Sequence, residues 1–266
     1  MDPQPSIDYR VLDRPDVLRC LFHPRSVPGP MDGGERYREL LIPVAPDTRI
    51  GARFHMAAAQ HANLLFFHGN GEIVADYDDI APLFNCREFN FIAVDYRGYG
   101  ISEGRPTVSA MMADCHPIFA FVGDWLKANG YNGPLIVMGR SLGSASALEL
   151  AAANPDGIDG LVIESGFAWA GPLLRLLGVD AKGIGFDEAH GFGNPEKIRR
   201  FTRPTVIIHA EYDHIIPFGD GEALYTASGA ADKELVKIPG ANHNDIFMYG
   251  LDQYLDALGR LAGKLT

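Results

Sequence analysis

The chain has 266 residues, of which 47% are hydrophobic and 21% charged, as in ordinary globular proteins. This length excludes a disulfide-stapled miniprotein, and the composition excludes a disordered chain and a coiled coil. The formal net charge is -11 without any cluster of Lys or Arg, so we expect no nucleic-acid partner, because an acidic surface repels phosphate. The length alone fits either one α/β domain with insertions or two small domains.

The three cysteines, Cys20, Cys86 and Cys115, lie far apart and form no C-x-x-C pair, which predicts reduced thiols rather than a disulfide framework or a zinc site. The N-terminus lacks the apolar core of a signal peptide, and no apolar stretch is long enough to span a bilayer. We therefore expect a soluble, cytoplasmic protein without stable membrane insertion. The sequence leaves the oligomeric state open.

Residues 1–35 are irregular and rich in proline and glycine, and we interpret them as an N-terminal extension of a domain over 36–266. Residues 36–44 and 48–56 predict two strands around a tight turn. Short apolar runs then alternate with helix-like stretches. The expected strands are 63–67, 91–95, 135–138, 161–163, 205–209 and 234–238, and the expected helices are about 73–84, 107–129, 142–153, 218–228 and 245–262.

Short apolar runs without polar alternation are typical of parallel strands that are covered on both faces. Their alternation with helices predicts an α/β fold with a mostly parallel, doubly wound sheet, and the first two strands should pair antiparallel. Residues 165–203 contain no strand pattern. We interpret this segment as a small helical cap inserted into the domain, because long structureless loops are uncommon in compact domains; a long surface loop is the alternative.

The pattern G-x-S-x-G occurs twice, around Ser102 and around Ser141. It indicates a catalytic nucleophile only where a strand leads through a sharp turn into a helix. Ser141 follows the apolar run 135–138 and precedes an Ala- and Leu-rich helix, whereas Ser102 lies in a Gly-rich loop with no helix after it. The pattern therefore favours Ser141 as the nucleophile, with a helix N-cap as the structural alternative.

A serine hydroxyl needs a base, and the base needs an acid that orients it. Asp213 and His243 each follow a predicted strand, and the order Ser, Asp, His goes with this motif. Because the carboxyl ends of parallel strands meet at one edge of the sheet, we expect Ser141, Asp213 and His243 to lie together there.

Other residues compete for these roles. Glu164 also follows a strand and is the alternative acid, while His68, His209 and His214 are alternative bases. His209 lies within a strand, which is more typical of a core histidine. The acidic and histidine side chains of 211–214 are too close along the chain for a typical metal site, so we expect no metal.

Acyl transfer also requires N–H donors for the developing oxyanion. We assign one to the backbone N–H of Leu142, at the start of the predicted helix, where the helix dipole favours negative charge. The other is the backbone N–H of Asn70, in a Gly-rich loop that follows the strand 63–67. An ordinary glycine turn is the alternative interpretation of that loop.

These motifs together resemble the α/β-hydrolase superfamily from about Leu40 to the C-terminus. Within it the chain is similar to the serine-hydrolase branch with a short cap, which includes Bem46-like and depalmitoylase-like proteins. The resemblance implies that no cofactor is used and that Ser102 lies in a structural loop. The segments that carry it are His68-Gly69-Asn70-Gly71, Asp95 to Ser102, Gly139 to Gly143, the strand ending before Asp213, and Gly240 to His243.

The leading hypothesis is a serine hydrolase that cleaves a carboxylic ester or thioester of a small-molecule acyl substrate through an acyl-enzyme on Ser141. A peptidase acting on small peptides and a catalytically inactive binding protein on the same scaffold are the alternatives. The aromatic residues of the insert could either line the acyl site or belong to its core; they are Phe167, Trp169, Phe186 and Phe192.

Overall fold

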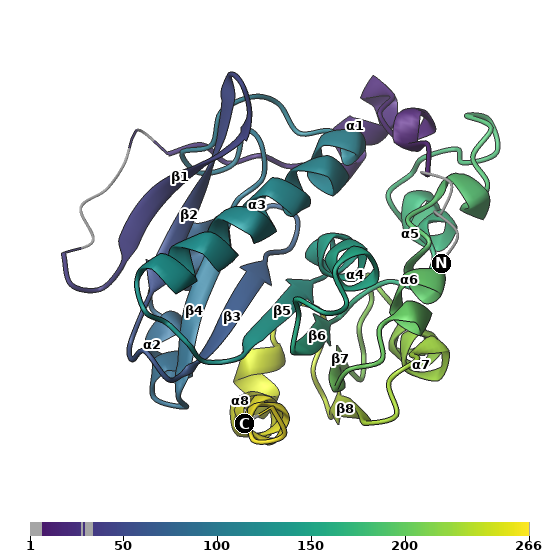
Figure 1. The fold of residues 1–266 in the computed structure, drawn as a ribbon. Coiled ribbons are helices and arrows are strands. Elements are labelled where there is room, and N and C mark those ends of the chain that lie inside the picture. The colour runs from purple at the N-terminus through teal and green to yellow at the C-terminus, as the bar shows by residue number, and fades with distance from the viewer. Residues whose placement is uncertain (1–6, 28, 30–33, 266) are drawn as a thin grey trace.

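A single eight-stranded sheet forms the centre of the computed structural model, which describes residues 7–27, 29 and 34–265 (Figure 1). The strands lie in the order β1-β2-β4-β3-β5-β6-β7-β8, and all neighbours are parallel except where β2 pairs with β1 and with β4. The strands are β1 (Arg38–Ala45), β2 (Thr48–His55), β3 (Ala62–Phe67), β4 (Phe89–Val94), β5 (Leu135–Arg140), β6 (Gly160–Glu164), β7 (Thr205–Ala210) and β8 (Lys233–Ile238).

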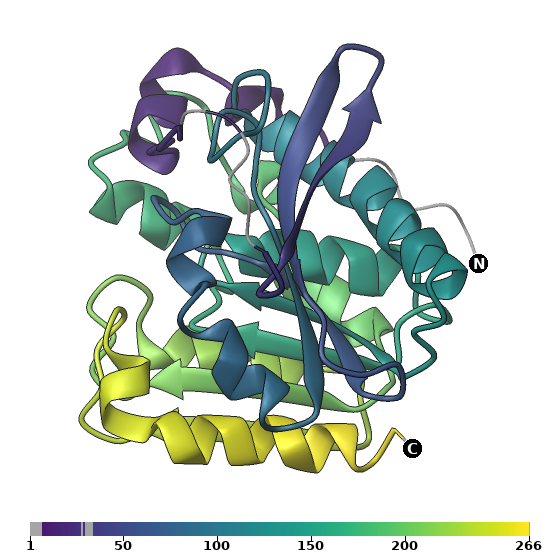
Figure 2. The ribbon, with the colours of Figure 1, turned by 90° about the vertical axis from the view of Figure 1, so that its left-hand side faces the viewer.

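Helices cover both faces of this sheet, with α8 on one side and α3 and α4 on the other (Figure 2). Each face has its own apolar core: Phe84, Phe91 and Tyr254 belong to the α2 and α8 side, whereas Val137 and Leu148 belong to the other. The helices are α1 (Pro15–Leu21), α2 (Ala81–Asn85), α3 (Val108–Ala128), α4 (Gly143–Ala153), α5 (Ala170–Leu176), α6 (Asn194–Arg200), α7 (Phe218–Ala227) and α8 (Ile246–Ala262).

The central strands have the apolar pattern that burial on both faces requires. Every residue of β3, β4 and β7 is buried, so no polar alternation is possible along them. The expected doubly wound α/β fold, including its antiparallel start, is confirmed. The helix expected over 73–84 is instead broken into a 3-10 turn, Val74–Tyr77, and α2, because Pro82 suits the first turn of a helix but not its interior.

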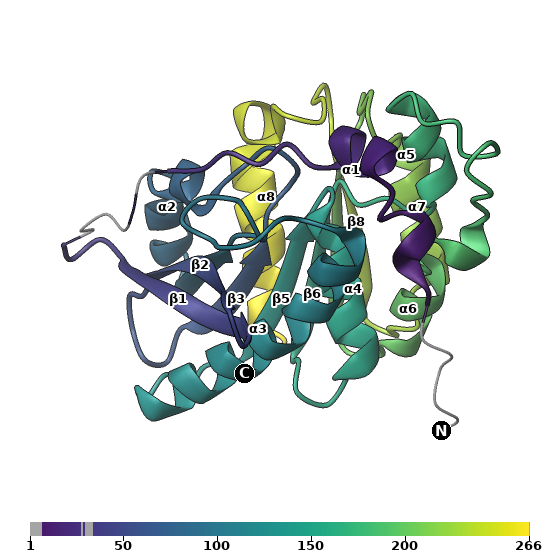
Figure 3. The same cartoon turned by 90° about the horizontal axis from the view of Figure 1, so that it is seen from above.

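The segment between β6 and β7 contains the helices expected there. In Figure 3, α5 lies next to α1, whereas α6 packs on α4 and α7 in the helical layer of the domain. The α5 part of the insert therefore lies near the edge where the parallel strands end. We retain the division into extension, domain and inserted cap as a proposal.

The N-terminal segment packs onto the domain through a 3-10 turn, Tyr9–Val11, and through α1. Leu12, Val17 and Leu21 are buried in the main core. Val27 then donates a backbone hydrogen bond to Gly100 (3.0 Å). Of the extension expected over 1–35, residues 1–6, 28 and 30–33 lie outside the described part of the chain. Within that described part, no helix combines the length and the hydropathy that crossing a membrane requires.

The turn from β5 into α4 depends on two glycines. A Cβ atom on Gly143 would overlap the carbonyl of Phe67, and one on Gly139 would overlap the carbonyl of Gly143. The atoms that would clash are backbone atoms at both positions, and these cannot move aside as a flexible side chain could. The sharp turn after β5 thus requires residues without a side chain.

Gly143→Ala should lower the free energy of unfolding by about 1–3 kcal/mol, because the added methyl overpacks backbone that cannot yield. Gly123→Ala is the matched control: Gly123 lies inside α3 with open space around it, and alanine should stabilise the helix by about 1 kcal/mol. Urea unfolding of both variants measures the difference. Equal effects of the two substitutions would contradict the steric argument.

Candidate active site

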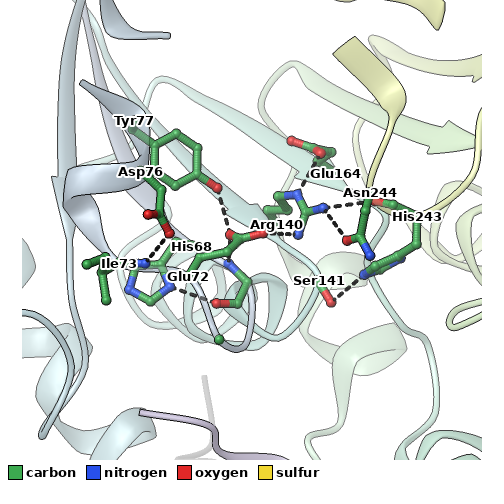
Figure 4. A network of polar contacts seen from close by, with 12 residues as sticks. His68, Glu72, Ile73, Asp76, Tyr77, Arg140, Ser141, Glu164, His243 and Asn244 are labelled. Atoms are coloured by element: carbon green, nitrogen blue, oxygen red, sulfur yellow. Dashed lines mark hydrogen bonds and ion pairs between the residues drawn. The ribbon is translucent and has the colours of Figure 1, made fainter. Parts of the chain in front are cut away.

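Ser141 lies on the sharp turn between β5 and α4. Its φ of 51° is in the left-handed region, which is strained for a residue with a side chain. Two backbone hydrogen bonds hold this conformation: Ser141 N–H donates to Glu164 O (2.9 Å), and Ser144 N–H donates to Ser141 O (3.0 Å). The strained backbone places the Ser141 side chain at the carboxyl edge of the sheet, where it faces His243 (Figure 4).

Three side chains expected to act together lie in one hydrogen-bonded row. His243 Nε2 is 3.0 Å from Ser141 Oγ, and His243 Nδ1 is 2.7 Å from Asp213 Oδ2. All three residues are buried, with exposed fractions of 8% for Ser141, 4% for His243 and 7% for Asp213. Because a carboxylate only accepts, the Asp213 contact places a proton on Nδ1 and leaves Nε2 to accept the Ser141 proton.

Asp213 is held in the loop after β7 by its own backbone. Its Oδ1 accepts the N–H groups of Ile215 (3.0 Å) and Ile216 (2.8 Å), which leaves Oδ2 for His243. Burial opposes the charged form, but the hydrogen bond and charge of His243, together with the Ile216 N–H, hold the pKa of Asp213 below its ordinary value. Asp213 is therefore an anion that fixes the orientation of the imidazole.

The two expected oxyanion donors lie near Ser141. Asn70 and Leu142 line the same cavity as Ser141 and His243. Among the described residues, no hydrogen bond uses the backbone N–H of either one. The Asn70 side chain is held in place, because its Oδ1 accepts from the His23 N–H (2.9 Å) and from the Tyr99 hydroxyl (2.9 Å).

The alternative acid and bases are used elsewhere. Glu164 bonds to Arg140 and to the Tyr254 hydroxyl (2.8 Å). His209 Nε2 is 2.8 Å from the carbonyl of Ile216, and burial lowers the pKa of His209. His214 is exposed and contacts the side-chain oxygen of Asn242.

Ser102, in the other G-x-S-x-G match, lies in a loop as the family resemblance implies. Its Oγ accepts the backbone N–H of Gly51 (2.8 Å), which ties this loop to β2. The two pentapeptides therefore have different surroundings, and only Ser141 faces a histidine in the described structure.

His68 is buried beneath the loop that contains Asn70. Its Nδ1 is 2.7 Å from Gly69 O, and its Nε2 is 3.1 Å from Asp95 Oδ1, so both ring nitrogens face acceptors. Burial alone would lower the pKa of His68, but the hydrogen bond and charge of Asp95 raise it above the ordinary 6.5. His68 is therefore a cation paired with Asp95, not a rival base.

A cavity of about 170 Å³ opens at Ser141. Its apolar wall comes from three separate segments: Leu21 of α1, Leu173 and Leu177 of the insert, and Ile215 after β7. The sequence patterns did not predict that any of these four residues lines the cavity, because only the packing of distant segments brings them together. Of the four aromatic candidates, Phe167 and Phe192 are core residues in ring contact (5.1 Å), Phe186 is half-buried and Trp169 is 44% exposed.

Comparisons with known proteins agree with this fold. The family model described as "Serine aminopeptidase, S33" matches residues 58–182. Alpha/beta hydrolase domain-containing protein 17C of Mus musculus is 31% identical over 223 residues, covering 80% of this chain and 64% of the relative. Protein 17B of Homo sapiens is 32% identical over 208 residues, covering 76% of this chain and 66% of the relative.

The chain belongs to the α/β-hydrolase superfamily. The resemblance drawn from its motifs is thereby confirmed. This α/β-hydrolase chain spans a little under two thirds of the length of those relatives. The esterase Pf2001 of Pyrococcus furiosus has the same fold, with a TM-score of 0.72 at 17% identity, over 92% of this chain and 98% of the esterase.

The raised pKa of His68 predicts a pH-dependent contribution to stability. A group whose pKa is raised on folding stabilises fully below its unfolded value, near 6.5, and loses this effect as the pH rises through its folded value. The difference in unfolding free energy between wild type and His68→Gln should therefore be largest below about pH 6.5 and shrink as the pH rises above that value. Urea unfolding on both sides of that value measures it. A difference that grows with pH would contradict the charge assignment.

Proposed function

We propose that this protein is a serine hydrolase that cleaves a carboxylic ester or thioester through an acyl-enzyme on Ser141. The observation that carries the proposal is the row from Ser141 Oγ through His243 to Asp213, with distances of 3.0 Å and 2.7 Å, on a strained turn. The curated relatives support a hydrolase in general. The choice of ester or thioester rests on the chemistry of the site.

In the first step, His243 Nε2 takes the proton of the Ser141 hydroxyl while Oγ forms a bond to the acyl carbonyl carbon. The carbonyl oxygen gains the negative charge, and the N–H groups of Leu142 and Asn70 would donate to it. Collapse of this tetrahedral intermediate breaks the bond to the alcohol or thiol. His243 returns its proton to that leaving group.

In the second step, a water molecule takes the place of the leaving group. His243 removes its proton while its oxygen attacks the acyl-enzyme, and the same two N–H groups stabilise the new oxyanion. The bond to Ser141 Oγ then breaks, and Oγ recovers a proton from His243. Asp213 stays charged throughout and stabilises the imidazolium that forms in each step.

The cavity wall supports an apolar acyl group. Leu21, Leu173, Leu177 and Ile215 present only hydrocarbon to the space beside Ser141. A second cavity of about 170 Å³ shares Leu173 and Ile215 with the first, so it could take the far end of a longer acyl chain. Burial of an acyl chain contributes roughly 0.8 kcal/mol for each CH2 group.

The peptidase alternative is favoured by the description of the matching family model. An aminopeptidase needs a carboxylate near the nucleophile to hold the substrate's amino group. No carboxylate is among the described residues that line the Ser141 cavity, and the nearby Glu72 and Glu164 both pair with Arg140. We therefore rank ester cleavage first; faster cleavage of aminoacyl p-nitroanilides than of p-nitrophenyl esters would reverse this order.

Ser141→Ala should abolish turnover of p-nitrophenyl butyrate, with a loss of about 10⁶-fold in kcat that leaves only background hydrolysis. Ser102→Ala is the matched control from the same pentapeptide pattern. It should keep kcat within about threefold of wild type, because Ser102 only ties its loop to β2. Initial rates of both purified variants measure this.

A fluorophosphonate probe supplies a second test, because it labels only an activated serine. Wild type and Ser102→Ala should be labelled, whereas Ser141→Ala should not. Absence of labelling in folded wild type would favour an inactive binding protein. Full activity in Ser141→Ala would exclude the proposed mechanism.

Leu173→Trp should reduce the space in both cavities, because Leu173 lines each of them and tryptophan is larger. We expect kcat/KM for the longest p-nitrophenyl ester that wild type cleaves to fall by about tenfold or more, since small changes in apolar pockets have effects of this size. Turnover of p-nitrophenyl acetate should change by less than about threefold. A parallel loss for all chain lengths would show that Leu173 does not contact the acyl chain.

A further inference from the structure

We infer that Arg140 is a positioning residue that holds the base loop and the oxyanion loop at fixed places around Ser141. The inference rests on the proposed function, because it concerns the same site. Arg140 ends β5 and directly precedes Ser141. Figure 4 shows its guanidinium between Glu72 and Glu164, with the His243 loop on its remaining side.

One arm of the guanidinium holds the loop that carries His243. Arg140 Nη2 donates to the backbone carbonyl of His243 (2.8 Å) and to Asn244 Oδ1 (3.1 Å). The first of these bonds holds the backbone of His243 itself, so it restrains the position from which the imidazole side chain extends. The contact with Asp213 restrains the other end of that ring.

A second arm holds the loop that carries Asn70. Arg140 Nη1 pairs with Glu72 Oε1, while Glu72 Oε2 accepts the backbone N–H of Gly69 (2.7 Å) and the Tyr77 hydroxyl (2.7 Å). Glu72 thereby accepts a hydrogen bond from the backbone of Gly69, the residue directly before Asn70. This contact restrains the peptide next to the expected oxyanion donor.

The third arm ties Arg140 to the strand beside it. Arg140 Nε donates to Glu164 Oε1 (3.1 Å), and Glu164 Oε2 accepts from the Tyr254 hydroxyl (2.8 Å). The backbone carbonyl of Glu164 accepts the Ser141 N–H, so the same residue restrains both the turn and the guanidinium. We call Arg140, Glu72 and Glu164 the bracket.

Two members of the bracket are largely withdrawn from water, and its cation is permanent. The Arg140 side chain is 11% exposed and that of Glu164 is 3% exposed, whereas that of Glu72 is 23% exposed. Burial opposes the charge of Arg140, but Glu72 and Glu164 raise its pKa further above its ordinary value. Ion pairs that are withdrawn from water in this way are screened little by salt and hold their geometry.

Lysine could not make the same contacts. The planar guanidinium carries five N–H groups on three nitrogens, all in fixed directions, whereas an ammonium is a single charge on a flexible chain. Arg140 donates to four acceptors from three segments: one bond comes from Nε, one from Nη1 and two from Nη2. The geometry of the fork, rather than its charge alone, therefore carries the positioning.

The test compares Arg140→Gln, Arg140→Lys and Glu72→Gln with Arg53→Gln. Arg53 is a matched control, because its side chain is 1% exposed and pairs with two carboxylates, Glu39 and Asp78, that are not members of the bracket. We expect kcat on p-nitrophenyl butyrate to fall about 100-fold in Arg140→Gln with KM within about twofold, since a small misplacement of reacting groups has this effect. Arg53→Gln should lose stability but keep kcat.

Two further results are expected. The kcat of Arg140→Lys should exceed that of Arg140→Gln by less than about threefold. Glu72→Gln should lower kcat by about tenfold relative to wild type, and it is the milder variant to use if Arg140→Gln does not fold. Affinity for an alkyl boronic acid, which mimics the tetrahedral intermediate, should weaken in parallel with kcat/KM. Lysine rescue, an unchanged kcat in both Arg140→Gln and Glu72→Gln, or an equal loss in Arg53→Gln would overturn the inference.

Amide hydrogen exchange gives a readout that does not depend on activity. In Arg140→Gln, exchange should accelerate in the segments 69–72 and 241–245, whereas Arg53→Gln should leave both unchanged. If wild type proved inactive on every ester while these segments loosened as expected, the proposed function would fail and the bracket would stand. If wild type were active and neither segment changed, only the bracket would fail.

Discussion

The sharp turn at Ser141 is the constraint on which the rest of the site depends. A φ of 51° at a residue other than glycine costs of order 1–3 kcal/mol in conformational free energy, so the surrounding structure must stabilise it. Gly139 and Gly143 let backbone approach backbone there, and the Glu164 carbonyl accepts the Ser141 N–H. The strain is thus distributed over β5, β6 and the start of α4, and the serine hydroxyl is presented beyond the sheet edge.

Buried charge organises the layer beneath this turn. Arg140 with Glu72 and Glu164, and His68 with Asp95, pair ionisable groups where water is scarce. Such pairs add little net stability compared with apolar packing, because desolvation offsets their attraction. These pairs matter because they are directional: each partner accepts or donates along a defined line. They therefore hold in one arrangement loops that apolar contacts alone would leave adjustable.

The wall of the cavity at Ser141 joins parts of the chain that are far apart in sequence. Leu21 comes from α1, Leu173 and Leu177 come from the insert, and Ile215 follows β7. His23, two residues after Leu21, also bonds to the Asn70 side chain. The N-terminal segment is therefore part of the site's surroundings, and packing changes there should reach both the wall of the Ser141 cavity and the loop that carries Asn70.

The sequence by itself determined the order of strands and helices, because burial on both faces leaves a pattern that local reading can detect. It also separated Ser141 from Ser102, and it pointed to Asp213, His243 and Asn70 as residues that follow strands. Parallel strands end at one edge, so residues at those ends converge without any knowledge of the side-chain packing. Their catalytic roles remain proposals, for which the mutations above are the tests.

Only the tertiary structure decided the partners of those residues. Nothing local to Arg140 indicates that it meets Glu72, 68 residues earlier, or the His243 carbonyl, 103 residues later. The same holds for Leu21 at the Ser141 cavity and for Asp95 at His68. Sequence periodicity reports which face of an element is buried, but the choice of contact across the fold follows from how the elements pack, and this is a property of the whole chain.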